Sequence, residues 1–345
     1  MSDLLVGAPA ATERFQFYGC GVEVSSREVA LVEEVRRDFL YFRRDAVEPQ
    51  LRIEMRLEPP PYAELPAVPA AFFTPRNVCF RQGGTMYVDY FGRALAVFER
   101  EAGRCVFYGT DHDLVHEAVY LFVLSTVGQA LDRAGLHRVH ALGVSYRDRA
   151  ILLLLPSGGG KSTMALELLR QPGFQLLGED TPLVDRRGRI LPFPLRLGVR
   201  PGSPTGVPEQ YLRTMRRMEF DPKTLIDISY FEDRLAPYGR PVDPGLILVG
   251  ERNLGQESDI LPLSRTGALK ALVKYSVVGL GVYQGLEFLL ERGIGDLAGK
   301  GGTAASRLYG SARLVARAPA YRFVLGRNIR RNTDRLLEFL RPADV

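Results

Sequence analysis

Apolar and polar positions alternate over short distances in the first third of the chain, with the period of a β-strand. This alternation predicts strands at residues 15–24, 50–58, 78–82, 85–91, 94–101 and 105–109. Residues 26–39 carry apolar positions at helical spacing, and the proline-rich residues 59–75 are expected to form a surface connection. Together these segments predict a meander of strands with one helix.

A long helix is predicted directly after these strands. Residues 118–131 read AVYLFVLSTVGQAL, which is apolar nearly all round and therefore typical of a buried helix. Thr110 followed by Asp113 predicts a capping box at the start of this helix, and Gly135 predicts its end.

The rest of the chain alternates buried strands with helices. Apolar runs predict further strands at 151–155, 174–180, 245–252 and 320–326. Helices are predicted at 266–290 and 328–340, and the glycine-rich residues 293–302 are expected to be mobile. This order of elements predicts an α/β fold, in which a β-rich N-terminal region at 1–112 precedes a second domain at 113–345.

Residues 150–169 join a strand, a glycine-rich turn and a helix. The apolar run leads into PSGGGKS at 156–162, and TMALELL follows at helical spacing. Backbone N–H groups of such a turn converge on one point, which the positive end of the helix dipole also faces. Lys161 adds a full charge near the β and γ phosphates of a nucleotide, and the Ser162 hydroxyl can ligate Mg²⁺. The residues predicted to bind the nucleotide here are Ser157, Gly158, Gly159, Gly160, Lys161, Ser162 and Thr163.

This turn departs from the usual P-loop pattern at one position. The pattern G-x-x-x-x-G-K-[ST] has a glycine where this chain has Leu155, and Pro156 has no N–H group to donate. The missing glycine mainly shapes the exit from the strand, so the phosphate-binding part at 157–162 is retained. The sequence therefore predicts binding of a nucleoside triphosphate, in preference to a chance glycine turn before a helix.

Two adjacent carboxylates end the next predicted strand. Glu179 and Asp180 stand where a P-loop enzyme binds Mg²⁺ or removes a proton from a hydroxyl, although an acidic turn is the alternative. We expect Asp180 to share the metal with Ser162, and either carboxylate to act as the base. The segment that follows carries Arg196 and Arg200, which are expected to neutralise phosphate charge.

The histidines form two pairs. His112 and His116 are four residues apart on the long helix, as metal ligands often are, but without a third ligand a surface pair is the favoured interpretation. His137 and His140 precede the strand before the glycine-rich turn. His140 is thereby expected to reach the phosphate site, although a structural histidine is the alternative.

Composition narrows the class of protein further. With 46% apolar and 25% charged residues in 345, the chain is typical of a globular protein with ample core. The net charge of +5 comes almost wholly from arginine, so neither nucleic acid nor a membrane is an expected partner. A solvated helix face is favoured over a binding surface for the C-terminal arginines, which are Arg322, Arg327, Arg330, Arg331 and Arg335.

The cysteines and the N-terminus indicate a cytoplasmic protein. Cys20, Cys79 and Cys105 are odd in number and lack CxxC spacing, which is typical of reduced thiols. The first residues show no basic stretch ahead of an apolar one, so no signal peptide is expected.

His140, the glycine-rich turn and the pair Glu179–Asp180 resemble, in order and spacing, the HPr kinase/phosphorylase-type P-loop serine kinases and their HprK-related relatives. The specific part of the resemblance spans residues 140–201. It implies a compact core similar to that of phosphoenolpyruvate carboxykinase, which uses ATP and Mg²⁺ to phosphorylate a serine hydroxyl. Lys161 would then hold the phosphates and Ser162 the metal, while His140 would lie near the transferred phosphate.

Two departures from that family concern the reaction itself. The first acidic residue is Glu179 where the family usually has aspartate, and Pro194 stands roughly where its following signature carries a glutamate. We therefore expect an ATP- and Mg²⁺-dependent phosphotransferase that acts on a serine of a peptide or protein, with a homo-oligomer as one assembly that it could form. The alternatives are a catalytically weak nucleotide-binding regulatory protein and a small-molecule kinase.

Overall fold

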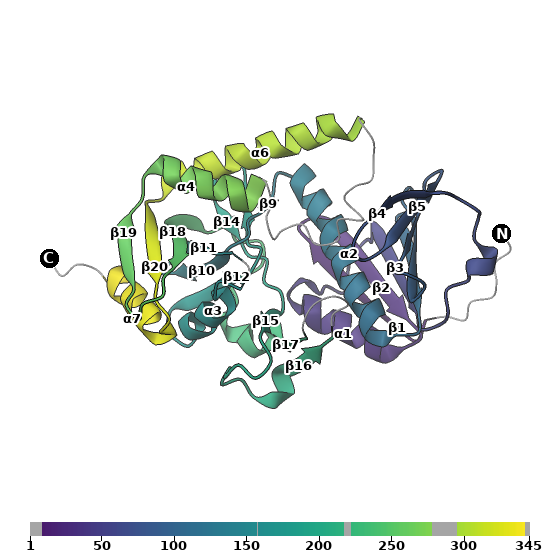
Figure 1. Ribbon diagram of the computed structural model, residues 1–345, viewed down its shortest axis with the longest axis horizontal. Coiled ribbons are helices and arrows are strands. Elements are labelled where there is room, and N and C mark those ends of the chain that lie inside the picture. Colours follow the sequence, from purple (N-terminus) through teal and green to yellow (C-terminus); the bar gives the residue numbers. More distant parts are fainter. Residues whose placement is uncertain (1–8, 157, 217–221, 278–294, 342–345) are drawn as a thin grey trace. The chain divides into compact units, whose positions relative to one another are not determined.

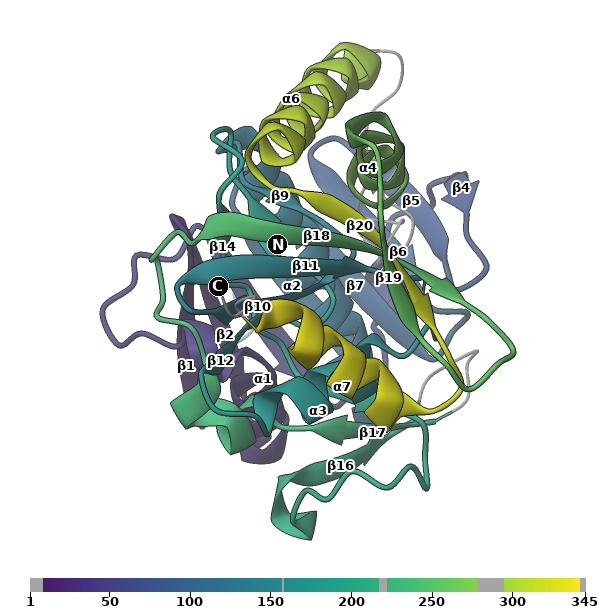
Figure 2. The ribbon, with the colours of Figure 1, turned by 90° about the vertical axis from the view of Figure 1, so that its left-hand side faces the viewer.

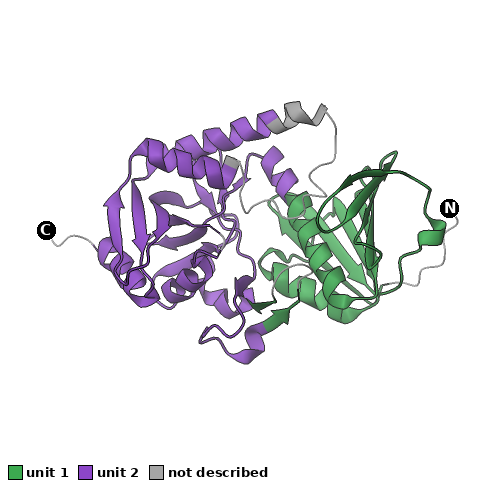
Figure 3. Cartoon of the chain, in the orientation of Figure 1, with its two compact units in different colours: residues 1–127, 213–225, 284–291 green, residues 128–212, 226–283, 292–345 purple. Residues whose placement is uncertain are grey.

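The computed structural model describes residues 9–156, 158–216, 222–277 and 295–341. It is a mixed α/β protein with 33% helix and 34% strand, which confirms the expected fold class at that level. Two compact units divide the chain: residues 1–127, 213–225 and 284–291 form unit 1, and residues 128–212, 226–283 and 292–345 form unit 2 (Figure 3). The domain boundary expected between residues 112 and 113 stays a prediction.

Unit 1 is built on an eight-stranded sheet with the order β1-β2-β3-β8-β7-β6-β5-β4. Its strands are β1 (Ala11–Phe17), β2 (Cys20–Ser26), β3 (Leu51–Arg56), β4 (Ala70–Phe73), β5 (Val78–Gln82), β6 (Thr85–Asp89), β7 (Ala94–Glu99) and β8 (Arg104–Gly109). β3 runs parallel to β2 and β8, and the other neighbours are antiparallel. The predicted meander is confirmed for β5–β8. The expected surface connection at 59–75 also contributes the edge strand β4.

Helices α1 (Val29–Phe39) and α2 (His112–Arg133) belong to the core of this sheet (Figure 1). The ring of Phe122 on α2 meets Phe98 and Phe107 edge-on, with centroids 5.0 and 5.5 Å apart. Phe39 at the end of α1 stacks on Tyr120 of α2 at 5.3 Å. Edge-on and offset aromatic contacts of this kind add to the free energy gained by burying the rings.

The start of α2 differs from the sequence expectation. The Asp111 carboxylate, and not the Thr110 hydroxyl, caps the helix by accepting a hydrogen bond from the Leu114 N–H at 3.2 Å. The expected end is confirmed, because Gly135 has φ +75° and the Leu136 N–H donates to the Leu131 carbonyl at 2.9 Å. By length and composition α2 could cross a membrane, but 83% of its most apolar window is buried inside the structure, as in a core helix.

Unit 2 contains a six-stranded mixed sheet with the order β12-β10-β11-β18-β20-β19. The strands of this sheet are β10 (Leu142–Tyr146), β11 (Arg149–Leu154), β12 (Phe174–Gly178), β18 (Asp243–Arg252), β19 (Asp259–Pro262) and β20 (Ala320–Leu325). β11, β18 and β20 are parallel, so their carboxyl ends meet at one edge. The four apolar runs that predicted buried strands in this part of the chain correspond to β11, β12, β18 and β20.

Helices cover both faces of this sheet (Figure 2). α3 (Lys161–Leu169) and α7 (Ile329–Leu340) lie on one face, and α4 (Arg265–Leu272) and α6 (Gly295–Arg317) on the other. Between the second pair and the strands lies a core of small and branched apolar residues, including Ala150, Leu152, Leu154, Ile247, Ala268, Leu272, Leu314 and Val315.

The helical predictions for this part hold in outline. The expected helix at 266–290 corresponds to α4 and the π-helical turn η5 (Val273–Val277), while its part at 278–290 lies outside the described residues. The glycine-rich stretch expected to be mobile at 293–302 belongs to α6 from residue 295 onward, and its mobility stays a prediction. Later turns of α6 are buried against the sheet, and such packing outweighs the low helix propensity of glycine.

The remaining elements are short. They are β9 (His137–Arg138), β13 (Leu183–Val184), β14 (Ile190–Leu191), β15 (Leu197–Val199), β16 (Leu212–Met215), β17 (Lys223–Ile226), η1 (Leu40–Phe42), η2 (Tyr62–Glu64), η3 (Glu209–Tyr211) and η4 (Ile228–Arg234). The first three form a small sheet of their own in unit 2, with the order β14-β13-β9.

Asn332 in the first turn of α7 fixes the connection between β20 and α7. Its side chain is fully buried; it donates to the Gly326 carbonyl at 3.0 Å and accepts from the Gly326 N–H at 2.9 Å. Both backbone groups of Gly326 are thereby satisfied away from water.

Replacing Asn332 by alanine should lower the free energy of unfolding by about 1–3 kcal/mol, because a buried N–H group loses its acceptor. Urea unfolding followed by circular dichroism measures this change. The matched control is Asn253→Ala, which removes an exposed amide that donates to the Glu257 carbonyl and should change stability by less than about 0.5 kcal/mol. Equal effects of the two changes would contradict the role given to Asn332.

Candidate functional site

The glycine-rich turn between β11 and α3 needs its glycines. Gly158 and Gly160 have φ values of +72° and +99°, which side chains rarely tolerate. A Cβ on Gly159 would lie 2.8 Å from the Pro156 carbonyl oxygen, to which the Gly159 N–H donates at 3.0 Å. The turn therefore brings its backbone close together in a way that only glycine allows, while Ser157 lies outside the described residues.

The amino end of α3 opens onto this turn. The first backbone hydrogen bond of the helix runs from the Met164 N–H to the Gly160 carbonyl at 3.0 Å. The N–H groups of the three preceding helical residues have no acceptor within the helix and carry the positive end of its dipole. Such an end attracts an anion. Thr163 lies in this first turn and is exposed.

Lys161 is buried, with 5% of the residue exposed. Its ammonium group lies 2.9 Å from the Leu155 carbonyl oxygen, 3.3 Å from the Pro156 carbonyl oxygen and 2.9 Å from His140 Nε2. An ammonium has three N–H donors, and three acceptors surround this one. A buried charge is tolerated when it is hydrogen-bonded in this way.

His140 connects Lys161 to Asp180. Because an ammonium only donates, His140 Nε2 must accept, and the ring proton is therefore assigned to Nδ1. Nδ1 lies 3.0 Å from Asp180 Oδ1, although the contact is not aligned as a good hydrogen bond. The same Asp180 oxygen is 3.6 Å from the Lys161 ammonium. The predicted approach of His140 to the glycine-rich turn is thus present in the structure.

Tyr275 covers the other side of the imidazole. Its ring stacks on the His140 ring with centroids 6.0 Å apart, and its backbone carbonyl accepts a hydrogen bond from the backbone N–H of His140 at 3.1 Å. Burial raises the pKa of the Tyr275 hydroxyl. Tyr275 lies in the π-helical turn η5, and such turns are frequent at functional sites. No pattern in the sequence indicates this contact.

The two acidic residues have different partners. Ser162 Oγ lies 2.6 Å from Glu179 Oε1 and 3.0 Å from the Gly198 carbonyl oxygen, whereas Asp180 faces His140 and Lys161. Ser162 and Asp180 are expected from the sequence to share a metal ion. In the structure the carboxylate next to the Ser162 hydroxyl is that of Glu179.

Arg252 also contacts the glycine-rich turn, although no sequence motif predicts it there. It ends β18, next to β11, and its guanidinium donates to the Gly159 carbonyl at 2.9 Å and to the Gly326 carbonyl at 3.0 Å. A Cβ on Gly160 would lie 2.5 Å from Arg252 Nη2, so the guanidinium lies directly against the turn. The sequence does show an arginine at the carboxyl end of an apolar strand. Assigning this arginine to the site, however, requires knowing that its strand, β18, lies beside β11.

The two arginines that were predicted from sequence flank β15. Arg196 is half-buried and Arg200 is exposed, and between them Gly198 accepts the second hydrogen bond of Ser162. The structure therefore brings the segment of Arg196 and Arg200 to the turn through its backbone.

These groups fit a phosphate with Mg²⁺. The N–H groups at the start of α3 and the cations Lys161 and Arg252 suit phosphate oxygens, while the oxygens of Ser162 and Glu179 suit a hard cation. Within the described residues no group of three or more His, Cys, Asp or Glu side chains could hold a metal ion alone. Mg²⁺ is usually bound by one or two carboxylates together with waters and substrate phosphates, so the smaller set is sufficient.

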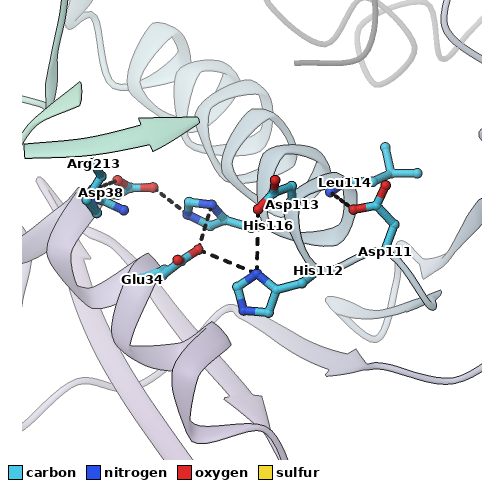
Figure 4. A network of polar contacts seen from close by, with 8 residues as sticks. All are labelled: Glu34, Asp38, Asp111, His112, Asp113, Leu114, His116 and Arg213. Carbon is cyan, nitrogen blue, oxygen red and sulfur yellow. Dashed lines mark hydrogen bonds and ion pairs between the residues drawn. The ribbon is translucent and has the colours of Figure 1, made fainter. Parts of the chain in front are cut away.

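A second polar cluster lies in unit 1 (Figure 4). His116 is 3% exposed; its Nδ1 lies 3.1 Å from Glu34 Oε2, and its Nε2 lies 2.8 Å from Asp38 Oδ2. Arg213 donates to the other oxygen of the fully buried Asp38 at 2.6 Å. The prediction of a surface pair is wrong for His116, which is a buried ion-pair partner, and only His112 is partly exposed.

Replacing Asp38 by asparagine should lower the free energy of unfolding by roughly 3–5 kcal/mol, because buried Arg213 and His116 lose their shared counter-charge. Urea unfolding measures the change. Glu33→Gln on the same helix removes the exposed ion pair with Arg36 and should cost less than about 1 kcal/mol. A loss for Asp38→Asn no greater than for Glu33→Gln would mean that the buried cluster does not stabilise unit 1.

No protein-family model matches the sequence, and no curated protein matches it. The resemblance to the HPr kinase-type enzymes therefore rests on His140, residues 156–162 and the pair Glu179–Asp180.

Proposed function

We propose that unit 2 carries a P-loop kinase core of the HPr kinase/phosphoenolpyruvate carboxykinase type. The proposed activity is an ATP- and Mg²⁺-dependent transfer of phosphate to a serine hydroxyl of a peptide or protein. The observation that carries the proposal is the convergence of Lys161, His140 and Asp180, together with Ser162 and Glu179, on one glycine-rich turn at a helix amino end. The predicted cytoplasmic location and homo-oligomer belong to the same proposal.

The residues divide the work of binding and charge neutralisation. Bound ATP with Mg²⁺ supplies the phosphoryl group and the metal charge that a loose phosphoryl transition state requires. The N–H groups at the start of α3 and the Lys161 ammonium hold phosphate oxygens, while Ser162 and Glu179 hold the metal. Arg252 keeps Gly159 in position through its carbonyl and adds positive charge beside the turn.

Asp180 is the proposed proton acceptor for the serine hydroxyl. The Asp180 carboxylate faces His140, whereas the Glu179 carboxylate lies beside the Ser162 hydroxyl. Glu179 is therefore the proposed metal ligand. His140 directs its Nδ1 side toward Asp180 and thereby orients that carboxylate. Arg196 and Arg200 lie on the segment that contacts Ser162 and are proposed to meet phosphate or acceptor.

The first experiment offers γ-labelled ATP and Mg²⁺ to the full-length protein together with HPr, serine-containing peptides or free serine. Label on a peptide or protein acceptor, lost in Lys161→Ala, would support the serine kinase. Label on free serine alone would favour the small-molecule kinase. Full activity of a folded Lys161→Ala variant would contradict the assignment of the glycine-rich turn as the phosphate-binding site.

A second experiment should distinguish the roles of Asp180 and Glu179. Asp180→Asn should lower turnover at least about 100-fold while ATP binding stays within a few fold, because a general base acts on the chemical step. Glu179→Gln should instead raise the Mg²⁺ concentration needed for half-maximal activity. Calorimetric nucleotide binding and a Mg²⁺ titration of the initial rate measure the two effects, and the reverse pattern would exchange the two roles.

A catalytically weak nucleotide-binding regulator is the second candidate. It is favoured by the three acceptors that the chain itself supplies to Lys161 and by Glu179 in place of the usual aspartate. This candidate predicts ATP binding with no label on any acceptor. In that case Glu179→Asp is the first change that should restore transfer.

A further inference from the structure

A further series of hydrogen-bonded polar side chains lies in unit 2, outside the glycine-rich turn. His137, at the start of β9, is 1% exposed. Its Nδ1 lies 2.8 Å from Asp132 Oδ1, and its Nε2 lies 2.8 Å from Ser306 Oγ. Asp132 belongs to the last turn of α2 and Ser306 to α6. A hydroxyl, an imidazole and a carboxylate are thus hydrogen-bonded in series.

The carboxylate is held in its charged form. Arg307 donates to both Asp132 oxygens, from Nε at 3.1 Å and from Nη2 at 2.6 Å. Burial raises the pKa of the Asp132 carboxyl, but the hydrogen bonds from His137 and Arg307 outweigh this effect and leave the pKa below its ordinary value. A charged carboxylate only accepts, so the His137 proton is assigned to Nδ1. Nε2 is then free of a proton and accepts from the Ser306 hydroxyl.

The residue that carries the hydroxyl is more exposed than the histidine beside it. Ser306 is half-buried, whereas His137 is almost wholly buried. On α6, Gly302 and Tyr309 lie one turn before and after Ser306 on the same face. Among the described residues, nothing beyond the backbone of α6 itself lies within 4 Å of the position of a Cβ on Gly302, and Tyr309 is 57% exposed. The described residues therefore leave one side of this α6 face open, beside an exposed aromatic ring.

We propose that Ser306, His137 and Asp132 form a second reactive site, in which Ser306 is a nucleophile that accepts an acyl group from an activated ester. A serine, a base within hydrogen-bonding distance and a third group that orients the base define such a site by geometry. Arg307 is a positioning residue, because it acts on Asp132 and not on Ser306.

The chemistry of the site balances without a further reactant. Ser306 Oγ forms a bond to the ester carbonyl carbon, and its proton passes to His137 Nε2. The bond from that carbon to the alcohol oxygen breaks, and the alcohol leaves with the proton from Nε2. Water then attacks the acyl-serine through the same base, which returns the proton to Ser306 and releases the acid.

Reactivity distinguishes this role from a structural one. A hydrogen bond that only fixed α6 to β9 would leave Ser306 as unreactive as other surface hydroxyls. The probe is a biotinylated fluorophosphonate, in which the serine oxygen displaces fluoride from phosphorus. It is applied to the full-length protein, and the labelled peptide is identified by mass spectrometry.

The wild-type protein should be labelled at Ser306, and Ser306→Ala should remove that label. Thr303→Ala, one turn earlier on α6, is the matched control and should keep it. Lys161→Ala should also keep the label, so the result is independent of phosphoryl transfer. Labelling of the wild type no greater than that of Ser306→Ala overturns the proposal.

The role of the base is tested by His137→Gln, which should slow labelling at least about 100-fold in a protein with unchanged circular dichroism. A second pair of variants avoids changing the buried histidine. Ser306→Cys should react with iodoacetamide at least about tenfold faster than Thr303→Cys near neutral pH, because an adjacent base raises the thiolate fraction. Equal alkylation rates of the two introduced thiols, or an undiminished labelling rate in folded His137→Gln, overturn the proposal.

Discussion

Burial of the Lys161 ammonium is the constraint on which the arrangement of unit 2 depends. A cation that is 5% exposed must find acceptors, because leaving it unpaired away from water would cost several kcal/mol. The Leu155 and Pro156 carbonyls meet this requirement only because the turn at Gly158–Gly160 folds the backbone back over the end of β11. The third acceptor, His140, is thereby held in the tautomer that directs its remaining N–H group toward Asp180.

The same edge of the sheet collects the supporting contacts. β11 and β18 are parallel neighbours, so Arg252 at the end of β18 reaches the Gly159 carbonyl. Its second bond, to Gly326, continues through Asn332 into α7. Hydrogen bonds of Arg252 and Asn332 therefore connect the glycine-rich turn, β20 and α7. Replacing either side chain is expected to alter the position of the turn.

The spacing of apolar residues predicted most of the strands and helices, because it reflects which faces of a strand or helix are buried. The glycine-rich turn and its partners His140 and Asp180 were also predictable, since chemistry restricts which residues can serve there. Arg252 and Tyr275 were not, because their roles depend on which strand and which turn lie beside the site. The burial of His116 was not predictable for the same reason: its partners are Glu34 and Asp38, and Asp38 in turn pairs with Arg213, which no local pattern connects.

The pairing of Asp38 with Arg213 also bears on how the chain folds as it is synthesised. These residues are 175 positions apart, and the buried carboxylate lacks its guanidinium partner until residue 213 has left the ribosome. Ribosomes add roughly 5–20 residues per second, so the N-terminal sheet spends on the order of ten seconds or more with an incomplete interior. Unit 1 is therefore complete only after residues 213–225 have been synthesised. A chain truncated at residue 127 would lack the guanidinium that neutralises Asp38, and recombinant fragments should be designed to include residues 213–225.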